Sequence, residues 1–283
     1  MAKVPRHFHF VFGLREQDEP FHLMHYLCLE SCRRTQAPER IFFHCRHLPY
    51  GPLWDRIAPH LDIRRVGERP RGFDPSLYQQ SAEGRFIADR GYVYAHEADF
   101  IRLEALIQHG GIYADMDTLF VQRYDDALLT HDCVLGEEAA MPDTTTGVLR
   151  PSLCNAVIIA QANAPFLLQW QALARQEFDG TWSRHSCQAA SQLWMSNPGL
   201  VQVAPLWRFY GLGSSIAGLK SLFEVDAPLP PGALSLHLWA HLWWSADRTD
   251  FSAFHQGLLN EDYVRAGATT YARLARPWLE PDA

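Results

Sequence analysis

The chain has 283 residues, 47% hydrophobic and 20% charged, a composition typical of a soluble globular protein rather than a disordered or fibrous one. Its net charge of -7 argues against a dominant nucleic-acid-binding surface, which normally carries excess positive charge. No run of about 18 apolar residues occurs, and the N-terminal segment lacks an apolar stretch of signal-peptide length. We therefore expect no nucleic-acid partner, no integral membrane segment and a cytoplasmic location, unless processing has removed a targeting segment.

The length is sufficient for one large hydrophobic core, and we expect a single domain over residues 1–283. The six cysteines include no CxxC pair, which argues against the commonest metal and redox motifs. We expect them to be reduced and mostly buried.

The first half of the chain alternates strand and helix patterns. Aromatic and β-branched residues at 7–13 predict a buried strand, helical spacing at 20–36 predicts a helix, and the run at 40–45 predicts a second strand. This order favours a parallel sheet. Residues 62–66 are a candidate third strand, and residues 69–95 have no dominant period and are expected to be partly helical.

An apolar stripe at residues 96–109 predicts a helix that ends at Gly110 and Gly111, since glycine readily adopts the backbone conformations that end helices. Further elements follow the same patterns: strands at 112–121, 133–138, 155–161, 200–205 and 233–239, and helices at 164–178 and 188–197. Prolines at 228, 230 and 231 predict a loop before the last strand.

Two aspartates, Asp115 and Asp117, fall in the strand-like run after the double glycine. In a strand their side chains would point to the same side, and two like charges there favour a bound cation such as Mg²⁺ or Mn²⁺. The alternative is a turn with both carboxylates in solvent. A DxD pair alone has low specificity. Asp99 and Arg102, one helical turn apart, are by themselves an ordinary surface ion pair.

The combination of these motifs is more specific. An A-D-x-x-R helix, a GG break and I-Y-x-D-x-D closely resemble the DXD glycosyltransferases of the sugar-binding-region type. That family includes α1,4-galactosyl- and N-acetylglucosaminyltransferases, the yeast initiating mannosyltransferase, bacterial capsule enzymes and, more distantly, clostridial glucosylating toxins. The resemblance implies an α/β fold of the GT-A nucleotide-diphospho-sugar transferase type, with a mixed central sheet flanked by helices.

The resemblance also implies roles for individual residues. Asp115, Asp117 and Arg102 would form the catalytic group, and Asp117 would bind Mn²⁺ or Mg²⁺ directly, assisted by Asp115 and His237. The nucleotide-sugar donor would contact these donor-site residues: Phe10, Val11, Asp99, Arg102, Asp115, Asn155 and Trp239. Ala98 stands where the family usually has serine.

The segment "ALSLHLWAHLWW" resembles a closing HxW motif of the α1,4-transferase branch. His237 would then reach the metal or the diphosphate, and the indole N–H of Trp239 would donate to a phosphate oxygen. His241 and Trp243 are the competing pair, and core packing is the alternative role for both tryptophans. Glu137 and Glu138 either face the acceptor or lie in a solvated turn.

The expected function is a metal-dependent retaining glycosyltransferase that moves a sugar from a nucleoside-diphosphate sugar, a UDP-sugar for preference, to a hydroxyl of a glycan, lipid or protein acceptor. Polysaccharide biosynthesis is the expected process. Two other classes remain alternatives. A metal-dependent phosphohydrolase also uses a DxD pair, although usually after the first strand. A non-catalytic carbohydrate-binding module would explain nine tryptophans but needs no carboxylate pair.

Overall fold

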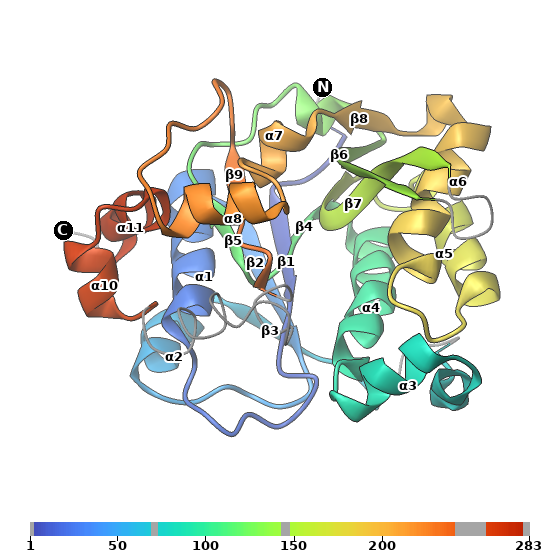
Figure 1. Cartoon of the computed structure of the whole chain (residues 1–283), viewed down its shortest axis with the longest axis horizontal. Helices are drawn as coiled ribbons and strands as arrows, with labels where there is room; N and C mark the ends of the chain where they lie inside the picture. The colour runs from blue at the N-terminus through green and yellow to red at the C-terminus, as the bar shows by residue number, and fades with distance from the viewer. Residues whose placement is uncertain (1–2, 69–72, 143–147, 241–258, 280–283) are drawn as a thin grey trace.

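The structure, a computed structural model, describes residues 3–68, 73–142, 148–240 and 259–279 (Figure 1). A central seven-stranded sheet has the strand order β3-β2-β1-β4-β7-β6-β8, and a two-stranded sheet pairs β5 with β9. The strands are β1 (His7–Val11), β2 (Arg40–Cys45), β3 (Asp62–Arg65), β4 (Gly111–Ala114), β5 (Thr118–Phe120), β6 (Cys133–Pro142), β7 (Leu149–Ala160), β8 (Gln202–Ala204) and β9 (Ser235–His237).

The central sheet is mixed because one strand is reversed. Strands β1, β2, β3 and β4 pair in parallel, whereas β7 is antiparallel to both β4 and β6. Strand β8 pairs in parallel with β6. The chain runs outward from β1 through β2 to β3 and then returns to place β4 on the other side of β1. In open α/β sheets, ligands bind beyond the carboxyl ends of strands at such a reversal.

Helices cover both faces of this sheet. Figure 1 shows α1 and α2 on one side and α4, α5 and α6 on the other. The helices are α1 (Leu23–Gln36), α2 (Pro52–Ile57), α3 (Ala82–Asp89), α4 (Val93–His109), α5 (Pro165–Glu177), α6 (Ala189–Ser196), α7 (Leu206–Tyr210), α8 (Ile216–Phe223), α10 (Glu261–Ala266) and α11 (Thr270–Ala275). Short 3₁₀ helices span Ala58–His60, Pro75–Gln80, Leu128–Thr130, Pro198–Leu200 and Arg276–Trp278, and a π-helical turn spans Arg184–Gln188.

Successive residues of the central strands enter two different hydrophobic clusters. In β4, Ile112 and Ala114 pack into the cluster that contains Leu27 of α1, whereas Tyr113 packs into the cluster that contains Phe100 of α4. Side chains alternate between the faces of a strand, so both faces of this sheet are buried. This explains why the sequence of the central strands is almost continuously apolar.

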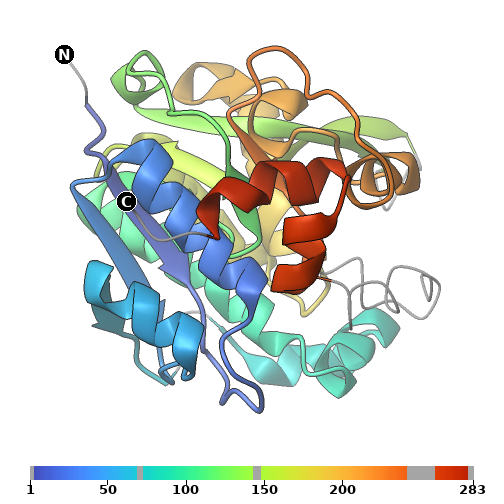
Figure 2. The same cartoon turned by 90° about the vertical axis from the view of Figure 1, so that its left-hand side faces the viewer.

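The C-terminal segment returns to the first helix of the chain. Both views place α11 beside α1 (Figures 1 and 2). Arg34 of α1 donates to the carbonyl of Pro277, 3.2 Å away, and its guanidinium lies over the ring of Trp278. These contacts attach the last described residues of the chain to α1.

Most elements expected from the sequence form at the expected places. The first two strands, the helix that ends at the double glycine, and the helices near 164–178 and 188–197 are all present. The expected α/β class, with a mixed central sheet flanked by helices, is confirmed. One expectation is wrong: the strand predicted over residues 112–121 is interrupted, because a turn separates β4 from β5.

All six cysteines are free, and five of them are buried, as the sequence predicted. Within the described ranges, no helix combines the length and the apolar character that a membrane crossing requires.

Gly111 is the tightest position of the double glycine. It has φ +123°, and a β-carbon there would lie 2.4 Å from the carbonyl oxygen of His7 on the neighbouring strand β1. Both the backbone conformation and the clash oppose any side chain. We expect Gly111→Ala to destabilise the protein by about 3 kcal/mol, measured as the free energy of unfolding in urea.

Gly199→Ala is the matched control, because a β-carbon at Gly199 meets no atom within 4 Å. It should change the free energy of unfolding by no more than about 0.5 kcal/mol. Equal stability of the two variants would contradict the packing argument for Gly111.

Candidate active site

The two aspartates lie in a tight turn at the carboxyl end of β4. The Asp115 N–H donates to the carbonyl of Ala156 on β7 at 2.9 Å, and the Thr118 N–H donates back to the carbonyl of Asp115 at 3.0 Å. The turn, rather than strand alternation, therefore orients the two carboxylates. The predicted convergence of Asp115 and Asp117 is present, but the predicted reason for it is wrong.

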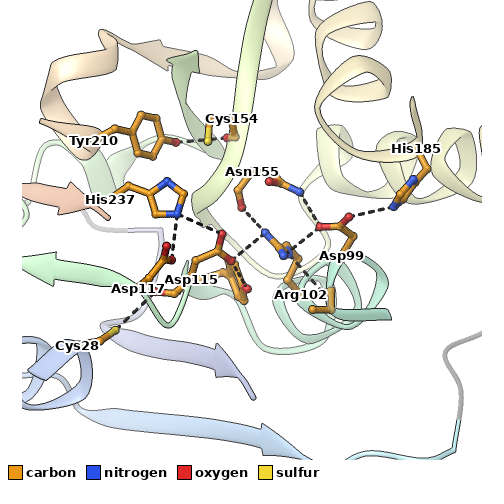
Figure 3. Close-up of polar contacts among 12 residues, drawn as sticks. Cys28, Asp99, Arg102, Asp115, Asp117, Cys154, Asn155, His185, Tyr210 and His237 are labelled. Carbon is orange, nitrogen blue, oxygen red and sulfur yellow. Dashed lines mark hydrogen bonds and ion pairs between the residues drawn. The ribbon is translucent and has the colours of Figure 1, made fainter. Parts of the chain in front are cut away.

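His237 joins the two aspartates from the far end of the chain. Strand β9 pairs with β5 so that His237 lies opposite Thr118, next to the DXD turn. Its Nε2 atom is 3.0 Å from Asp117 Oδ1 and 3.7 Å from Asp115 Oδ2 (Figure 3). A single short strand pair thus brings together two residues that are 120 positions apart in the sequence.

Asp117 has additional contacts that fix its position. Its Oδ2 atom accepts from the Ala240 N–H at 2.7 Å, and its backbone carbonyl accepts from the Leu238 N–H at 2.9 Å. Trp239, between these two donors, has the left-handed φ of 56°, a conformation that is rare for a bulky residue and that occurs most often at functional sites. The residues after β9 therefore wrap around the Asp117 carboxylate.

Charges in this group influence one another strongly. Burial disfavours the imidazolium form of His237, but the carboxylates of Asp117 and Asp115 outweigh this effect and raise its pKa. Burial raises the pKa of Asp115, and the opposing effect of Arg102 does not cancel it. Such a site favours a cation, because a cation would relieve both the buried negative charge and the repulsion between the aspartates.

The donor atoms fit a divalent metal ion. One ligand atom from each of Asp115, Asp117 and His237 lies within 4.8 Å of the other two. Carboxylate oxygens suit magnesium and manganese, and an imidazole nitrogen suits a borderline ion such as manganese better than magnesium. The residues that the sequence singled out as metal ligands are therefore close enough to share one ion.

Arg102 connects this group to Asp99. Its guanidinium lies 3.0 Å from Asp99 Oδ1 and 3.2 Å from Asp115 Oδ1, and it donates to the backbone carbonyl of Asn155 at 2.8 Å. The ring of Tyr113 lies under the same guanidinium at 4.4 Å. Arg102 is only 5% exposed, so it is not the surface ion-pair partner that the helix spacing alone suggested.

Asn155 reaches the site through an irregularity in β7. The pairing of β6 with β7 shifts between Leu135 and Gly136, which leaves three residues of β7 beginning at Asn155 without partners on β6. Bulges of this kind redirect side chains and are common next to active sites. The amide of Asn155 donates to Asp99 Oδ1 at 2.7 Å.

The remaining predicted donor contacts differ in their accessibility. Phe10 is fully buried, and its ring packs edge-to-face against Phe120, so only its backbone groups are available for the predicted donor contact. Val11 lies at the carboxyl end of β1 and is 8% exposed. Trp239 is 2% exposed and packs 4.2 Å from the ring of His237. The competing pair, His241 and Trp243, lies outside the described residues.

Two residues at the site were missed by the sequence analysis. Tyr113 donates its hydroxyl to Asp115 Oδ1 at 2.6 Å; it stands inside the I-Y-x-D-x-D motif, so the motif itself was a signal for it. His185 lies 2.9 Å from Asp99 Oδ2, but it is 86 residues away in a segment without a recognisable pattern.

Comparison with known proteins decides the family. Residues 67–135, which include Asp99, Arg102 and both aspartates of the turn, match the model of the family described as glycosyltransferase sugar-binding region containing DXD motif. The chain is also 31% identical over 294 residues to Glucan organizing enzyme 1 of Cryptococcus neoformans var. grubii serotype A (strain H99), and the match covers 98% of this chain and 71% of that protein.

The chain belongs to the DXD glycosyltransferase family. Among solved structures it is similar to the PaToxG glycosyltransferase (14% identity, 97% of this chain and 87% of that one, TM-score 0.45). It is also similar to the glycosyltransferase GlyE of Streptococcus pneumoniae TIGR4 (13%, 98% and 63%, TM-score 0.45). A third similar structure is the UDP-bound glycosyltransferase domain of the YGT toxin (10%, 72% and 80%, TM-score 0.42).

The resemblance inferred from the motifs and the expected enzyme class, a glycosyltransferase, are thereby confirmed. The two alternative classes lose their support. In particular, the aspartates follow β4 rather than the first strand, where a phosphohydrolase usually carries them.

Proposed function

We propose that the protein is a metal-dependent retaining glycosyltransferase that moves a sugar from a nucleoside-diphosphate sugar, most simply a UDP-sugar, to an acceptor hydroxyl. The observation that carries the proposal is the convergence of Asp115, Asp117 and His237 beyond the carboxyl end of β4. These three residues would hold Mn²⁺ or Mg²⁺, which supplies a Lewis acid for the negative charge that develops on the leaving diphosphate.

The reaction needs the bond between the sugar C1 atom and the diphosphate oxygen to break, with the electron pair leaving on the diphosphate. The acceptor oxygen forms the new bond to C1 on the same face, and its proton passes to a diphosphate oxygen. This route requires no nucleophile from the protein. The tasks left to the chain are to hold the donor, to orient its sugar and to exclude water.

The arrangement of side chains suits these tasks. Arg102 holds Asp115 through an ion pair, whereas the Asp117 carboxylate accepts a hydrogen bond from the Ala240 N–H, so the two aspartates have different environments. The Asp99 carboxylate, which contacts Arg102 and Asn155, would accept a hydrogen bond from a hydroxyl group of the donor sugar or ribose. Trp239, beside His237, would place its indole N–H near the diphosphate.

The proposal for the class of acceptor rests on the related Cryptococcus protein and not on the geometry of the site. The name of the Cryptococcus protein contains the word glucan, which favours a glycan acceptor, and hence polysaccharide biosynthesis, over a lipid or protein acceptor. The free cysteines are consistent with a reducing compartment, and we propose that the described chain acts in the cytoplasm as one catalytic domain.

A hydrolysis assay without acceptor tests the proposal. The purified chain is incubated with UDP-glucose, UDP-galactose or GDP-mannose, and released nucleoside diphosphate and free sugar are measured together. We expect one donor to be hydrolysed with Mn²⁺ present, no turnover after EDTA treatment, and recovery when excess Mn²⁺ is added back.

The products separate the rival functions. Release of nucleoside monophosphate and sugar 1-phosphate without free sugar would indicate a phosphohydrolase, and binding without turnover of any donor would indicate a carbohydrate-binding module. The proton NMR spectrum of the first sugar released should show the anomer of the donor, which a retaining enzyme preserves. The opposite anomer would refute the retaining mechanism.

A further inference from the structure

A buried polar network continues from the DXD turn into the helical layer behind it, and Asp99 is its central acceptor. Oδ1 of Asp99 accepts from Asn155 Nδ2 at 2.7 Å and lies 3.0 Å from the Arg102 guanidinium. Oδ2 lies 2.9 Å from His185 Nε2 (Figure 3). Burial raises the pKa of Asp99, but Arg102 and His185 outweigh it and lower the pKa overall. The group is therefore an ionised carboxylate with three protein donors.

His185 is held rigidly by its surroundings. It lies in the π-helical turn Arg184–Gln188, in which the Gln188 N–H donates to the carbonyl of Ser183, five residues earlier. Turns of this kind are rare and occur frequently at functional sites. The His185 carbonyl accepts from the indole N–H of Trp170 at 3.3 Å, so the turn is also anchored to α5.

Aromatic side chains fix the orientation of the His185 ring. The ring stacks on Phe100 with centroids 5.5 Å apart and planes 5° apart, and it meets Phe178 edge-to-face at 5.0 Å. His96 packs against it at 4.7 Å and 73°. Only 1% of the His185 side chain is exposed, so close packing prevents it from adopting another rotamer.

The hydrogen bonding determines which nitrogen carries the proton. Nδ1 of His185 is buried and has no hydrogen-bond partner among the described residues, whereas Nε2 faces the Asp99 carboxylate. A proton on Nδ1 would be a buried donor without an acceptor, which is costly. The ring is therefore the tautomer with its proton on Nε2, and it donates that proton to Asp99 Oδ2.

Counting acceptor positions shows what remains for a ligand. A carboxylate has about four lone-pair positions, two on each oxygen. Asn155 and Arg102 share Oδ1, and His185 takes one position on Oδ2. One position on Oδ2 is left for a ligand hydroxyl, and the Asp99 side chain is 12% exposed.

We infer that His185 is a positioning residue for donor recognition: its Nε2–H fixes the Asp99 carboxylate so that the last acceptor position of Oδ2 faces one hydroxyl of the donor sugar. The inference rests on the proposed function. His185 itself does not touch the substrate. It acts through Asp99, and its contribution belongs to binding of the sugar rather than to departure of the diphosphate.

The test compares two buried histidines of one aromatic cluster. His185→Phe keeps the stacking on Phe100 but removes the hydrogen bond to Asp99, whereas His96→Phe removes a hydrogen bond to Tyr78 at 2.7 Å and leaves Asp99 with all three donors. Steady-state hydrolysis of the UDP-sugar that the wild type prefers is measured with Mn²⁺, together with binding of UDP alone and the melting temperature.

For His185→Phe we expect the KM for the UDP-sugar to rise about tenfold to a hundredfold, as for loss of a hydrogen bond to a charged group. The kcat should stay within about threefold and the Kd for UDP within about twofold. His96→Phe should lose comparable thermal stability with an unchanged KM. The same KM in both variants, or an equal loss of UDP affinity, would overturn the inference.

A second pair of variants covers the case in which His185→Phe does not fold. Glutamine at position 185 can place an amide N–H near the position of Nε2, whereas asparagine is too short to do so. His185→Gln should keep the KM near the wild-type value and His185→Asn should raise it, and equal KM values would overturn the inference. A wild-type protein that hydrolyses no nucleoside-diphosphate sugar would instead refute the proposed function, on which the inference depends.

Discussion

Replacing Asp117 by asparagine is expected to lower kcat/KM for metal-dependent donor hydrolysis by at least about 10³-fold while the fold is retained. The change removes one of the two negative charges that would hold the cation, and asparagine offers one neutral oxygen in place of a carboxylate. The fold should tolerate the change because the side-chain oxygen of asparagine can still accept from the Ala240 N–H, and because the repulsion from Asp115 disappears. The free energy of unfolding should change by no more than about 1 kcal/mol.

Two measurements on the Asp117 variant separate a metal role from a structural one. Mn²⁺ should raise the melting temperature of the wild type, since a ligand that binds only the native state stabilises it, and this increase should disappear in Asp117→Asn. Glu104→Gln removes the same charge from the exposed face of α4 and should behave as the wild type in both assays. Full activity of Asp117→Asn without added metal would remove the metal from the proposed mechanism.

The elements that the sequence predicted well are those in which one short-range pattern dominates. The strand at 40–45 and the end of the helix at the double glycine were predicted to the residue, because their apolar positions repeat with the strand or helix period and glycines mark the end of the helix. The reversed direction of β7 was not predicted. Direction depends on long-range pairing, which the residues of the strand do not encode locally.

The DXD turn shows a limit of period-based reasoning. The residues from Ile112 to Val121 alternate well enough to be interpreted as one strand, yet the chain turns at Asp115 and Asp117. The turn forms because the following strand pairs with β9 rather than with the central sheet. A partner more than 100 residues away therefore determined the local structure, and only the family resemblance pointed to His237.

The residues that support Asp99 were predicted to different degrees. Arg102 and Asn155 were candidates because they lie in segments that resemble motifs of the family. In the structure both residues contact Asp99. His185 was not a candidate, because no spacing relates it to the α4 helix and its π-helical turn has no known sequence signature here. Side chains that act through another residue are harder to identify from a single sequence than residues of the motif itself, because they lie outside any recognisable motif.

Acid is expected to unfold this protein at a comparatively high pH, near pH 5. Burial lowers the pKa of His9 to about 3 and the pKa values of His44 and His96 to about 4, from an ordinary value near 6.5. The native state therefore keeps these histidines neutral under conditions in which the unfolded chain already binds protons. Stability is greatest above about pH 6.5 and is lost as the pH falls from there toward about 4.

The slope gives the magnitude of the effect. These three histidines alone, at about 1.4 kcal/mol per pH unit each, lower the free energy of unfolding by about 4 kcal/mol per pH unit, and His25, whose pKa burial also lowers to about 4, adds to the slope. The total stability of a domain is about 5–15 kcal/mol, so for a stability near the lower end of that range one to two pH units of acidification suffice to reach the midpoint. Urea titrations at several pH values between 7 and 5 measure this slope directly.

A substitution at His9 tests which groups are responsible. The His9 ring on β1 stacks on the Phe42 ring with centroids 4.8 Å apart, and His9 Nδ1 lies 3.1 Å from His44 Nε2 on the neighbouring strand β2. His9→Phe therefore preserves an aromatic ring but removes one titrating group. We expect a lower stability at pH 7, because the carbonyl of Gly110 loses its partner, and a slope shallower by about 1.4 kcal/mol per pH unit. His60→Gln, at an exposed histidine, should leave the slope unchanged. An identical slope in the wild type and in His9→Phe would contradict the contribution of His9 to the acid unfolding.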